Sequence, residues 1–230
     1  MRNDFTDITI LLDRSGSMGT ICNDTIGGFN SFVKEQQAVP GEACLTLVQF
    51  DNEYEVNYEA VKLSNVEKLT DSTYRPRGTT ALLDALGKTI VRTGERLSAM
   101  KEEDRPGKVI FVTITDGEEN ASKEYKKDVI AKMVKVQQES FSWNFVFLGA
   151  NIDSFSEAQG LNLYAGNVVN YSATGDGVQK AFKIATRGMT SYRAGGQCVT
   201  DSFFAGSSHA DDVVSGSPDD KLSPANDKTV

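Results

Sequence analysis

Residues 8–17 read Ile-Thr-Ile-Leu-Leu-Asp-Arg-Ser-Gly-Ser, and this stretch decides the fold. An apolar run of this kind is typical of a parallel strand that is buried on both faces of a sheet. The run ends at Asp13, and Ser15 and Ser17 follow at alternate positions. A carboxylate and two hydroxyls are hard oxygen ligands, which suit Mg²⁺, Mn²⁺ or Ca²⁺. The stretch therefore predicts a strand that delivers oxygen ligands to the carboxyl edge of a sheet.

Strand and helix signals alternate along the rest of the chain, which indicates a doubly wound α/β fold. Residues 54–60 alternate in polarity with period two and predict an antiparallel edge strand, paired in a hairpin with residues 43–50. The other expected strands are residues 109–115, 145–148 and 168–171. The expected helices cover residues 21–33, about 80–100, about 126–139, about 153–159 and about 178–192.

Composition excludes several classes of protein. The chain has 230 residues and a formal net charge of −8, without a basic stripe, so we expect no nucleic-acid partner. No apolar stretch is long enough to cross a membrane, and the N-terminus lacks a hydrophobic signal region. The three cysteines, Cys22, Cys44 and Cys198, show no paired spacing, and we expect Cys22 and Cys44 to be buried free thiols. We therefore expect a cytoplasmic protein without a membrane partner.

The composition changes near residue 194, where Gly, Ser and Asp become frequent. We expect a domain over residues 1–195 and a flexible acidic tail over residues 196–230, because the tail has too few apolar residues to offset the entropy of ordering. Phe203-Phe204 is its one hydrophobic spot. The tail could order on a partner, could enter the crevice of another copy through Asp211 or Asp212, or could be inert. The oligomeric state stays open, with a monomer favoured.

A second and a third group of oxygen ligands belong at the same edge as Asp13. Asp116 ends the strand predicted over residues 109–115, and Thr80 directly precedes a predicted helix. Open α/β sheets bind ligands beyond the carboxyl ends of their strands, so these groups face one crevice if the two strands are neighbours. Only two of the five groups are anionic, so a bound divalent cation would keep positions free for a carboxylate from another protein.

These residues resemble the von Willebrand factor A-type family, whose metal-ion-dependent adhesion site has the pattern Asp-x-Ser-x-Ser, then Thr, then Asp. The segment 77–86 is similar to the family's Gly-Gly-Thr-x-Leu-x-Asp-Ala-Leu stretch and aligns Thr80 with the metal-site threonine, with Thr79 as the alternative. Thr115-Asp116-Gly117 is similar to the Thr-Asp-Gly ending of bacterial and phage cytoplasmic members.

The resemblance covers roughly residues 5–192 and implies a Rossmann-like three-layer fold with a central, mostly parallel sheet. It also implies metal-dependent, non-catalytic protein binding, with Mg²⁺ as the first choice of metal and Mn²⁺ or Ca²⁺ as alternatives. The metal ligands that it implies are Asp13, Ser15, Ser17, Thr80 and Asp116.

Two other interpretations stay open. A metal-dependent phosphohydrolase could use Asp13 or a metal-bound water as nucleophile, but Ser15 occupies the position where such an enzyme places a second carboxylate. The hydroxyls and Asp116 could instead be helix caps and a turn residue, although this leaves their common spacing unexplained.

Residues around this motif carry further expectations. We expect Glu118 and Glu119 to lie in a solvated loop, with a role in supporting the metal ligands or in facing a partner as the alternatives. We expect Arg14 and Met18 to face outward from the metal loop, either in contact with a partner or simply at the surface. Trp143 should pack in the core.

Overall fold

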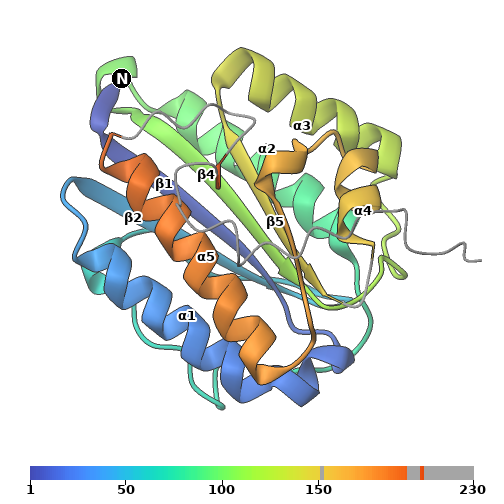
Figure 1. Cartoon of the computed structure of the whole chain (residues 1–230). Coiled ribbons are helices and arrows are strands. Elements are labelled where there is room, and N and C mark those ends of the chain that lie inside the picture. The colour runs from blue at the N-terminus through green and yellow to red at the C-terminus, as the bar shows by residue number, and fades with distance from the viewer. Residues whose placement is uncertain (151–152, 196–202, 205–230) are drawn as a thin grey trace, which may run out of the picture.

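The computed structural model describes residues 1–150, 153–195 and 203–204. Within them a six-stranded sheet has the order β3-β2-β1-β4-β5-β6, with β1 and β4 at its centre (Figure 1). All neighbouring strands are parallel except the edge strand β3, which is antiparallel to β2. The strands are β1 (Arg2–Asp13), β2 (Glu42–Phe50), β3 (Tyr54–Lys62), β4 (Pro106–Thr115), β5 (Asn144–Ala150) and β6 (Val168–Tyr171).

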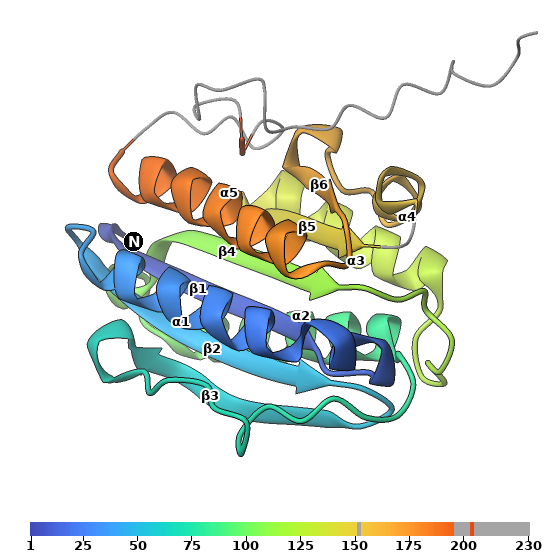
Figure 2. The same cartoon turned by 60° about the horizontal axis from the view of Figure 1, so that its bottom comes forward.

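Helices cover both faces of the sheet, which gives three layers (Figure 2). Helices α1 and α5 pack on one face, whereas α2 and α3 pack on the other. The helices are α1 (Cys22–Gln37), α2 (Leu82–Ala99), α3 (Lys127–Phe141), α4 (Ser154–Gly160) and α5 (Gly175–Arg193). The fold class expected from the sequence, a mostly parallel sheet with one antiparallel edge strand and helices on both faces, is confirmed.

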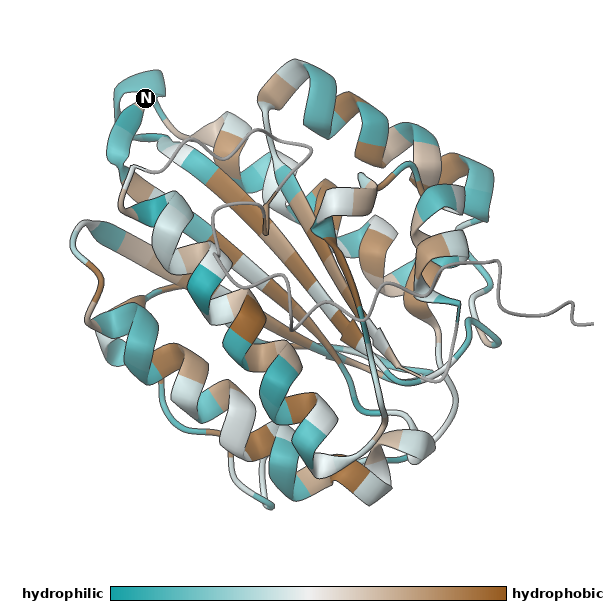
Figure 3. Cartoon of the chain, in the orientation of Figure 1, coloured by the Kyte–Doolittle hydropathy of each residue, from teal (hydrophilic) through white to brown (hydrophobic). Residues whose placement is uncertain are grey.

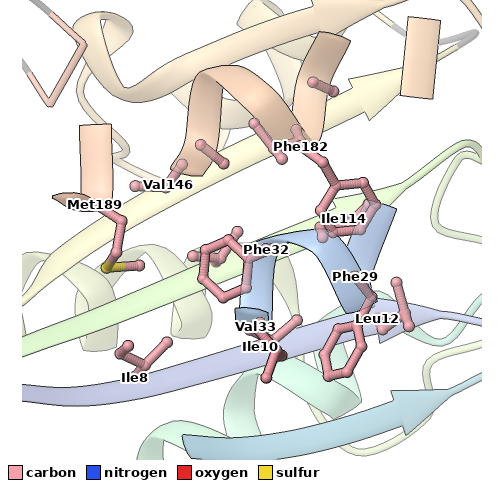
Figure 4. Packing of buried hydrophobic residues seen from close by; sticks show 14 of the residues in the cluster. Ile8, Ile10, Leu12, Phe29, Phe32, Val33, Ile114, Val146, Phe182 and Met189 are labelled. Carbon is pink, nitrogen blue, oxygen red and sulfur yellow. The ribbon is translucent and has the colours of Figure 1, made fainter. Parts of the chain in front are cut away.

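The apolar run of β1 supplies both halves of the core, because successive side chains of a strand point to opposite faces. Ile8, Ile10 and Leu12 pack under α1 and α5, whereas Leu11 packs under α2. Figure 4 shows the first group meeting the side chains of α1 and α5, and Figure 3 shows the apolar residues gathered on the strands and on the inner faces of the helices. The strand is therefore buried on both sides, and its carboxyl end emerges at a fixed place.

Helices α1 and α5 approach each other closely at Gly28. A Cβ atom built on Gly28 would lie 2.2 Å from the ring of Phe182, so only glycine fits there. Glycine costs helix stability relative to alanine, and here that cost permits the aromatic ring of α5 to pack directly on the backbone of α1.

The element boundaries differ in places from those expected. Strand β1 begins at Arg2, and a 3₁₀ helix over Gly16–Ile21, which no periodic pattern indicated, precedes α1. Trp143 packs in the core as expected, stacked on Phe111 at 5.3 Å between ring centroids. Cys44 is a buried free thiol, whereas Cys22 is only half-buried; Cys198 lies outside the described residues. Among the described helices, none combines the length and apolar character needed to span a bilayer.

The predicted tail has two described residues, and they contact the domain. Phe203 is buried, and its backbone N–H donates to Asn167 Oδ1 at 2.8 Å. Its ring lies 6.2 Å from that of Tyr192 and beside the backbone of Gly188, where a Cβ atom would lie 2.6 Å from it. The predicted division at residue 195 stays a prediction, but Phe203 belongs to the core cluster under α5. Asp211 and Asp212 lie outside the described residues.

Candidate metal site

The site lies where the two central strands end. Asp13 is the last residue of β1, and Asp116 directly follows β4. These strands are parallel neighbours, with Leu12 paired to Ile114. The two carboxylates therefore emerge at the same edge of the sheet, as the sequence predicted.

Hydrogen bonds connect four of the predicted residues, Asp13, Ser15, Ser17 and Asp116, in sequence. Asp13 Oδ1 accepts the backbone N–H of Ser15 at 2.6 Å, and Asp13 Oδ2 accepts the Thr115 hydroxyl at 2.6 Å. The Ser15 and Ser17 hydroxyl oxygens lie 3.1 Å apart, and the Ser17 hydroxyl donates to Asp116 Oδ1 at 2.6 Å. Alternate residues of the loop after β1 thus connect the carboxylate of one strand to that of the next.

Thr80, rather than Thr79, brings its hydroxyl to this cluster. The Thr80 and Ser17 hydroxyls both lie close to Gly117: a Cβ atom built on Gly117 would lie 3.2 Å from Thr80 Oγ1 and 3.4 Å from Ser17 Oγ. Thr80 is buried and Thr79 is exposed. Glycine directly after Asp116 thus leaves room for the Thr80 and Ser17 hydroxyls to approach the end of β4, and the alignment of the family's threonine with Thr80 agrees with the geometry.

Both carboxylates are buried without a positive partner. Asp13 is 0% exposed and Asp116 is 2% exposed. Burial raises the pKa of Asp13 to about 6, against the opposing effect of the donors Thr115 and Ser15, and the charge of Asp116 raises it further. Burial likewise raises the pKa of Asp116. Among the described residues no lysine or arginine forms an ion pair with either group, so the cluster has an excess of negative charge.

Arg14 does not neutralise its neighbour Asp13. The expectation that Arg14 faces outward is wrong, because its side chain is 8% exposed and pairs with Asp51 at 3.1 Å and with Glu55. Met18 is also not outward-facing: it is 0% exposed and packs in the core beneath α1 and α5. The 3₁₀ helix after Ser15 explains the burial of Met18, because it breaks the alternation that an extended loop would have continued. Arg14 precedes that helix: its N–H donates to the Phe50 carbonyl at 2.8 Å, which continues the pairing of β1 with β2, and its side chain pairs with Asp51.

The loop after Asp116 holds Thr80 in place, which the sequence did not indicate. Thr80 N–H donates to Asn120 Oδ1 at 2.9 Å, and the N–H groups of Asn120 and Ala121 donate to the Thr80 carbonyl. Glu119, expected in a solvated loop, instead accepts the N–H of Leu83 at the start of α2 at 2.9 Å. A carboxylate at a helix N-terminus satisfies a free N–H donor. Glu119 therefore caps α2, which is the role that the helix-cap interpretation assigns to Thr80.

Two tyrosines fix the backbone at the strand ends, and neither was identified as a site residue from the sequence. The Tyr74 hydroxyl donates to the Asp13 carbonyl at 2.6 Å, and the Tyr171 hydroxyl donates to the Thr115 carbonyl at 3.2 Å. Tyr74 lies in a polar segment without periodic pattern, so nothing local predicted its burial. Tyr171 ends a predicted strand, and the contact of its hydroxyl with the end of β4, across β5, depends on strand order.

The donor set fits a hard divalent cation. It offers carboxylate oxygens of Asp13 and Asp116 and hydroxyl oxygens of three further residues, and it contains no sulfur or nitrogen donor. Within the described part of the chain, no group of three or more His, Cys, Asp or Glu side chains could hold a metal. A cation here would therefore depend on the hydroxyls of Ser15, Ser17 and Thr80 together with the two uncompensated carboxylates.

Comparisons with known proteins agree with this fold. The model of the von Willebrand factor type A domain matches residues 7–165, so the chain belongs to that family. None of the curated proteins matches the sequence.

Solved structures with the same fold include proximal thread matrix protein 1 from the mussel byssus, described with a zinc-occupied MIDAS motif, at 15% identity and a TM-score of 0.56 over 83% of this chain and 47% of that one. The manganese-loaded TRAP protein of Plasmodium vivax matches at 13% identity and a TM-score of 0.51, over 79% of this chain and 73% of that one. The pilus adhesin SpaC from Lactobacillus rhamnosus GG matches at 14% identity and a TM-score of 0.58, over 81% of this chain and 31% of that one. The present chain thus spans about half the length of the mussel protein.

Proposed function

We propose that this protein is a metal-dependent protein-binding module and not an enzyme. Asp13, Ser15, Ser17, Thr80 and Asp116 would hold a divalent cation, Mg²⁺ in the first place and Mn²⁺ or Ca²⁺ as alternatives. The partner is another protein that presents an Asp or Glu side chain. The observation that carries this proposal is the pair of buried carboxylates, Asp13 and Asp116, joined through Ser15 and Ser17. Within the described part of the chain, no lysine or arginine forms an ion pair with either of them.

The residues of the chain do two things in this proposal. They create a negative pocket in which a cation replaces the missing positive charge, and they hold its oxygens in place through Gly117, Asn120 and Tyr74. When bound, the cation would supply a coordination position for the partner's carboxylate. A carboxylate partner suits a site with few anionic ligands, because the cation then keeps part of its charge for it.

Relatives with this fold give the proposal general support. The mussel protein has a zinc-occupied MIDAS motif, TRAP has been loaded with manganese, and SpaC is an adhesin. Their identities of 13–15% carry the fold alone, so the metal and the partner of this chain rest on its own residues. The cytoplasmic location and the bacterial or phage origin suggested by the sequence belong to the proposal too, and the free thiol of Cys44 is compatible with a reducing compartment.

Partner capture with and without chelator tests this function. The immobilised chain is mixed with an extract of its source in millimolar Mg²⁺ and then washed with EDTA. We expect a partner to be retained in Mg²⁺ and released by EDTA, and we expect Asp116→Ala to abolish retention. Asp128→Ala is the matched control, because Asp128 is an exposed aspartate of α3 whose nearest cation, Lys132, lies 3.9 Å away. A partner whose retention is indifferent both to EDTA and to Asp116→Ala would contradict the proposal.

A further inference from the structure

Asp51, directly after β2, is the centre of a second polar cluster beside the site. It is 0% exposed. Its Oδ2 accepts Arg14 Nε at 3.1 Å and Arg77 Nε at 2.9 Å, and its Oδ1 accepts the N–H of Glu53 at 2.6 Å. Its backbone carbonyl accepts the N–H of Ala81 at 2.9 Å. One buried residue therefore binds two segments, around Arg14 and over residues 77–81, that are far apart in sequence.

Each of those segments carries or adjoins a predicted metal ligand. Arg14 lies between Asp13 and Ser15, and Ala81 follows Thr80. Arg77 connects the two, because its backbone N–H donates to the Arg14 carbonyl at 2.7 Å.

Glycines complete the connection on either side. The N–H of Gly16 donates to the carbonyl of Gly78 at 3.1 Å, so the segment before Thr80 runs alongside the loop after β1. Gly78 has a φ of +67°, and a Cβ atom there would lie 2.1 Å from Asn52 Oδ1. The segment is therefore seated directly on the β2–β3 turn, where Asp51 lies.

The two arginines are themselves held at both ends. Arg14 also pairs with Glu55 of β3, and Arg77 also pairs with Glu53 of the turn. Charge-assisted hydrogen bonds to a buried carboxylate are stronger than neutral ones and fix the planar guanidinium groups in direction. The cluster therefore has a defined geometry.

We infer that Asp51 is a positioning residue of the metal site, acting through Arg14 on the Asp13–Ser17 loop and through Arg77 and Ala81 on Thr80. This inference rests on the proposed function, because it assigns to Asp51 the relative placement of ligands that come from two different loops. The hydroxyl ligands depend on such placement more than carboxylates do, because a neutral oxygen has little attraction for a cation at a distance. Residues that orient metal ligands contribute typically 10–100-fold to metal affinity.

Titration with Mn²⁺, read as free Mn²⁺ by electron paramagnetic resonance, tests the inference. We compare the wild-type chain with Asp51→Asn, Arg77→Gln and the control Arg92→Gln. Arg92 pairs with Glu59 at 2.5 Å and is 48% exposed, against 55% for Arg77, so the control removes a similar arginine–glutamate pair far from the ligands. We expect the Kd for Mn²⁺ to rise about 10-fold in Asp51→Asn and about 3-fold or more in Arg77→Gln, with Arg92→Gln unchanged.

The outcomes separate this inference from the proposed function. If the wild type binds Mn²⁺ and the folded Asp51→Asn and Arg77→Gln variants bind it equally well, Asp51 does not position the site. If the wild type itself does not bind Mn²⁺, the proposed function fails, and the inference fails with it. If Asp51→Asn does not fold, Arg77→Gln decides, because its half-exposed side chain can be replaced without leaving a buried cavity. A loss of affinity as large in Arg92→Gln as in Arg77→Gln would also overturn the inference.

Discussion

Asp13 illustrates how a single side chain can be unfavourable for folding and useful for binding. Its carboxylate lies at the end of a fully buried strand and accepts hydrogen bonds from Ser15 and Thr115. These donors do not compensate for burial, which raises the pKa of Asp13 from 3.8 to about 6. The metal-free folded state therefore binds a proton at Asp13 more tightly than the unfolded chain does. A cation removes that preference by stabilising the charged form.

The raised pKa of Asp13 predicts that Asp13→Asn becomes more stable relative to the wild type as the pH rises. The contribution of the protonated group to stability is complete below about pH 4 and is lost as the pH rises through about 6. A change of roughly two pKa units corresponds to about 3 kcal/mol of stability that the wild type loses as the pH rises. Asp13→Asn does not lose this stability, because asparagine does not titrate. We therefore expect the free energy of unfolding of metal-free Asp13→Asn, minus that of the wild type, to increase by about 2–3 kcal/mol between pH 4 and pH 7. Urea titrations at each pH measure it, and a pH-independent difference would contradict the account.

The common location of the five predicted ligands at one edge of the sheet could be predicted from the sequence, because each follows a strand or precedes a helix, where local patterns are informative; their binding of a metal stays a prediction. Orientation within the loop could not be predicted. Met18 is buried because the chain turns into a 3₁₀ helix, and such a short turn has no periodic signature. Arg14 is buried because its side chain pairs with Asp51, which is distant in sequence. Asp51 lies between the strands predicted over residues 43–50 and 54–60, but its hydrogen bonds to Arg14 and Arg77 could not be predicted, because they join segments that are distant in sequence.

At the scale of elements, the site depends on how the loop after β4 is joined to the first turn of α2. Asp84, in that turn, accepts the N–H groups of Lys123, Glu124 and Tyr125 at 2.9–3.0 Å. Burial acts to raise the pKa of Asp84, but these donors outweigh it, and the pKa lies below its ordinary value. In return, Ser122 Oγ accepts the N–H of Asp84 at 3.0 Å. Helix α2 and the loop thus cap each other.

Asp84→Asn should weaken this connection. The amide keeps one acceptor oxygen for three N–H donors, so we expect the free energy of unfolding to fall by about 1–3 kcal/mol at pH 7. The same carboxylate predicts that the loss shrinks as the pH falls through the lowered pKa, because the wild type then loses its charge too. Chemical denaturation measures both effects. Asp128→Asn, with its exposed i,i+4 partner, serves as the control and should change stability by less than about 0.5 kcal/mol. Equal effects of the two substitutions would argue against the capping role.

Element types were predictable and element ends were less so. The helical period over residues 178–192 identified α5, which begins at Gly175 with Thr174 as its cap, at 3.2 Å from the N–H of Gly177. The polar residues at the start of β1 hid its true length, because this part of the strand pairs with β2 and β4 without contributing to the core. Pairing is a property of the partner strand and is not encoded in local polarity.

At the scale of the whole molecule, the packing of Phe203 extends the core beyond the last helix. The composition after residue 194 is that of a tail, yet Phe203 is 3% exposed and fills the space left by Gly188. Composition averages over many residues, so one buried aromatic side chain in a polar segment is easily missed. Asn167, whose Oδ1 accepts the N–H of Phe203, ties this contact to β6.

Phe203→Ala tests whether this contact stabilises the fold. Removing a buried phenylalanine typically costs about 3–5 kcal/mol, and we expect a loss near the lower end because the site lies at the surface of the core. Phe141→Ala is the control, since Phe141 is 62% exposed and its removal should change stability by less than about 0.5 kcal/mol. Thermal and urea unfolding of both variants supply the comparison. A Phe203→Ala variant as stable as the wild type would show that the contact does not contribute to the fold.

The cation itself can be located most directly by anomalous diffraction from crystals grown in millimolar Mn²⁺. We predict one strong anomalous peak bounded by Asp13, Ser15, Ser17, Thr80 and Asp116, at about 2.1–2.3 Å from the oxygens that coordinate it, and we predict that Asp116→Ala removes it. Crystals of the folded wild-type protein with no peak at this edge of the sheet, or with a peak that survives Asp116→Ala, would contradict the central claim.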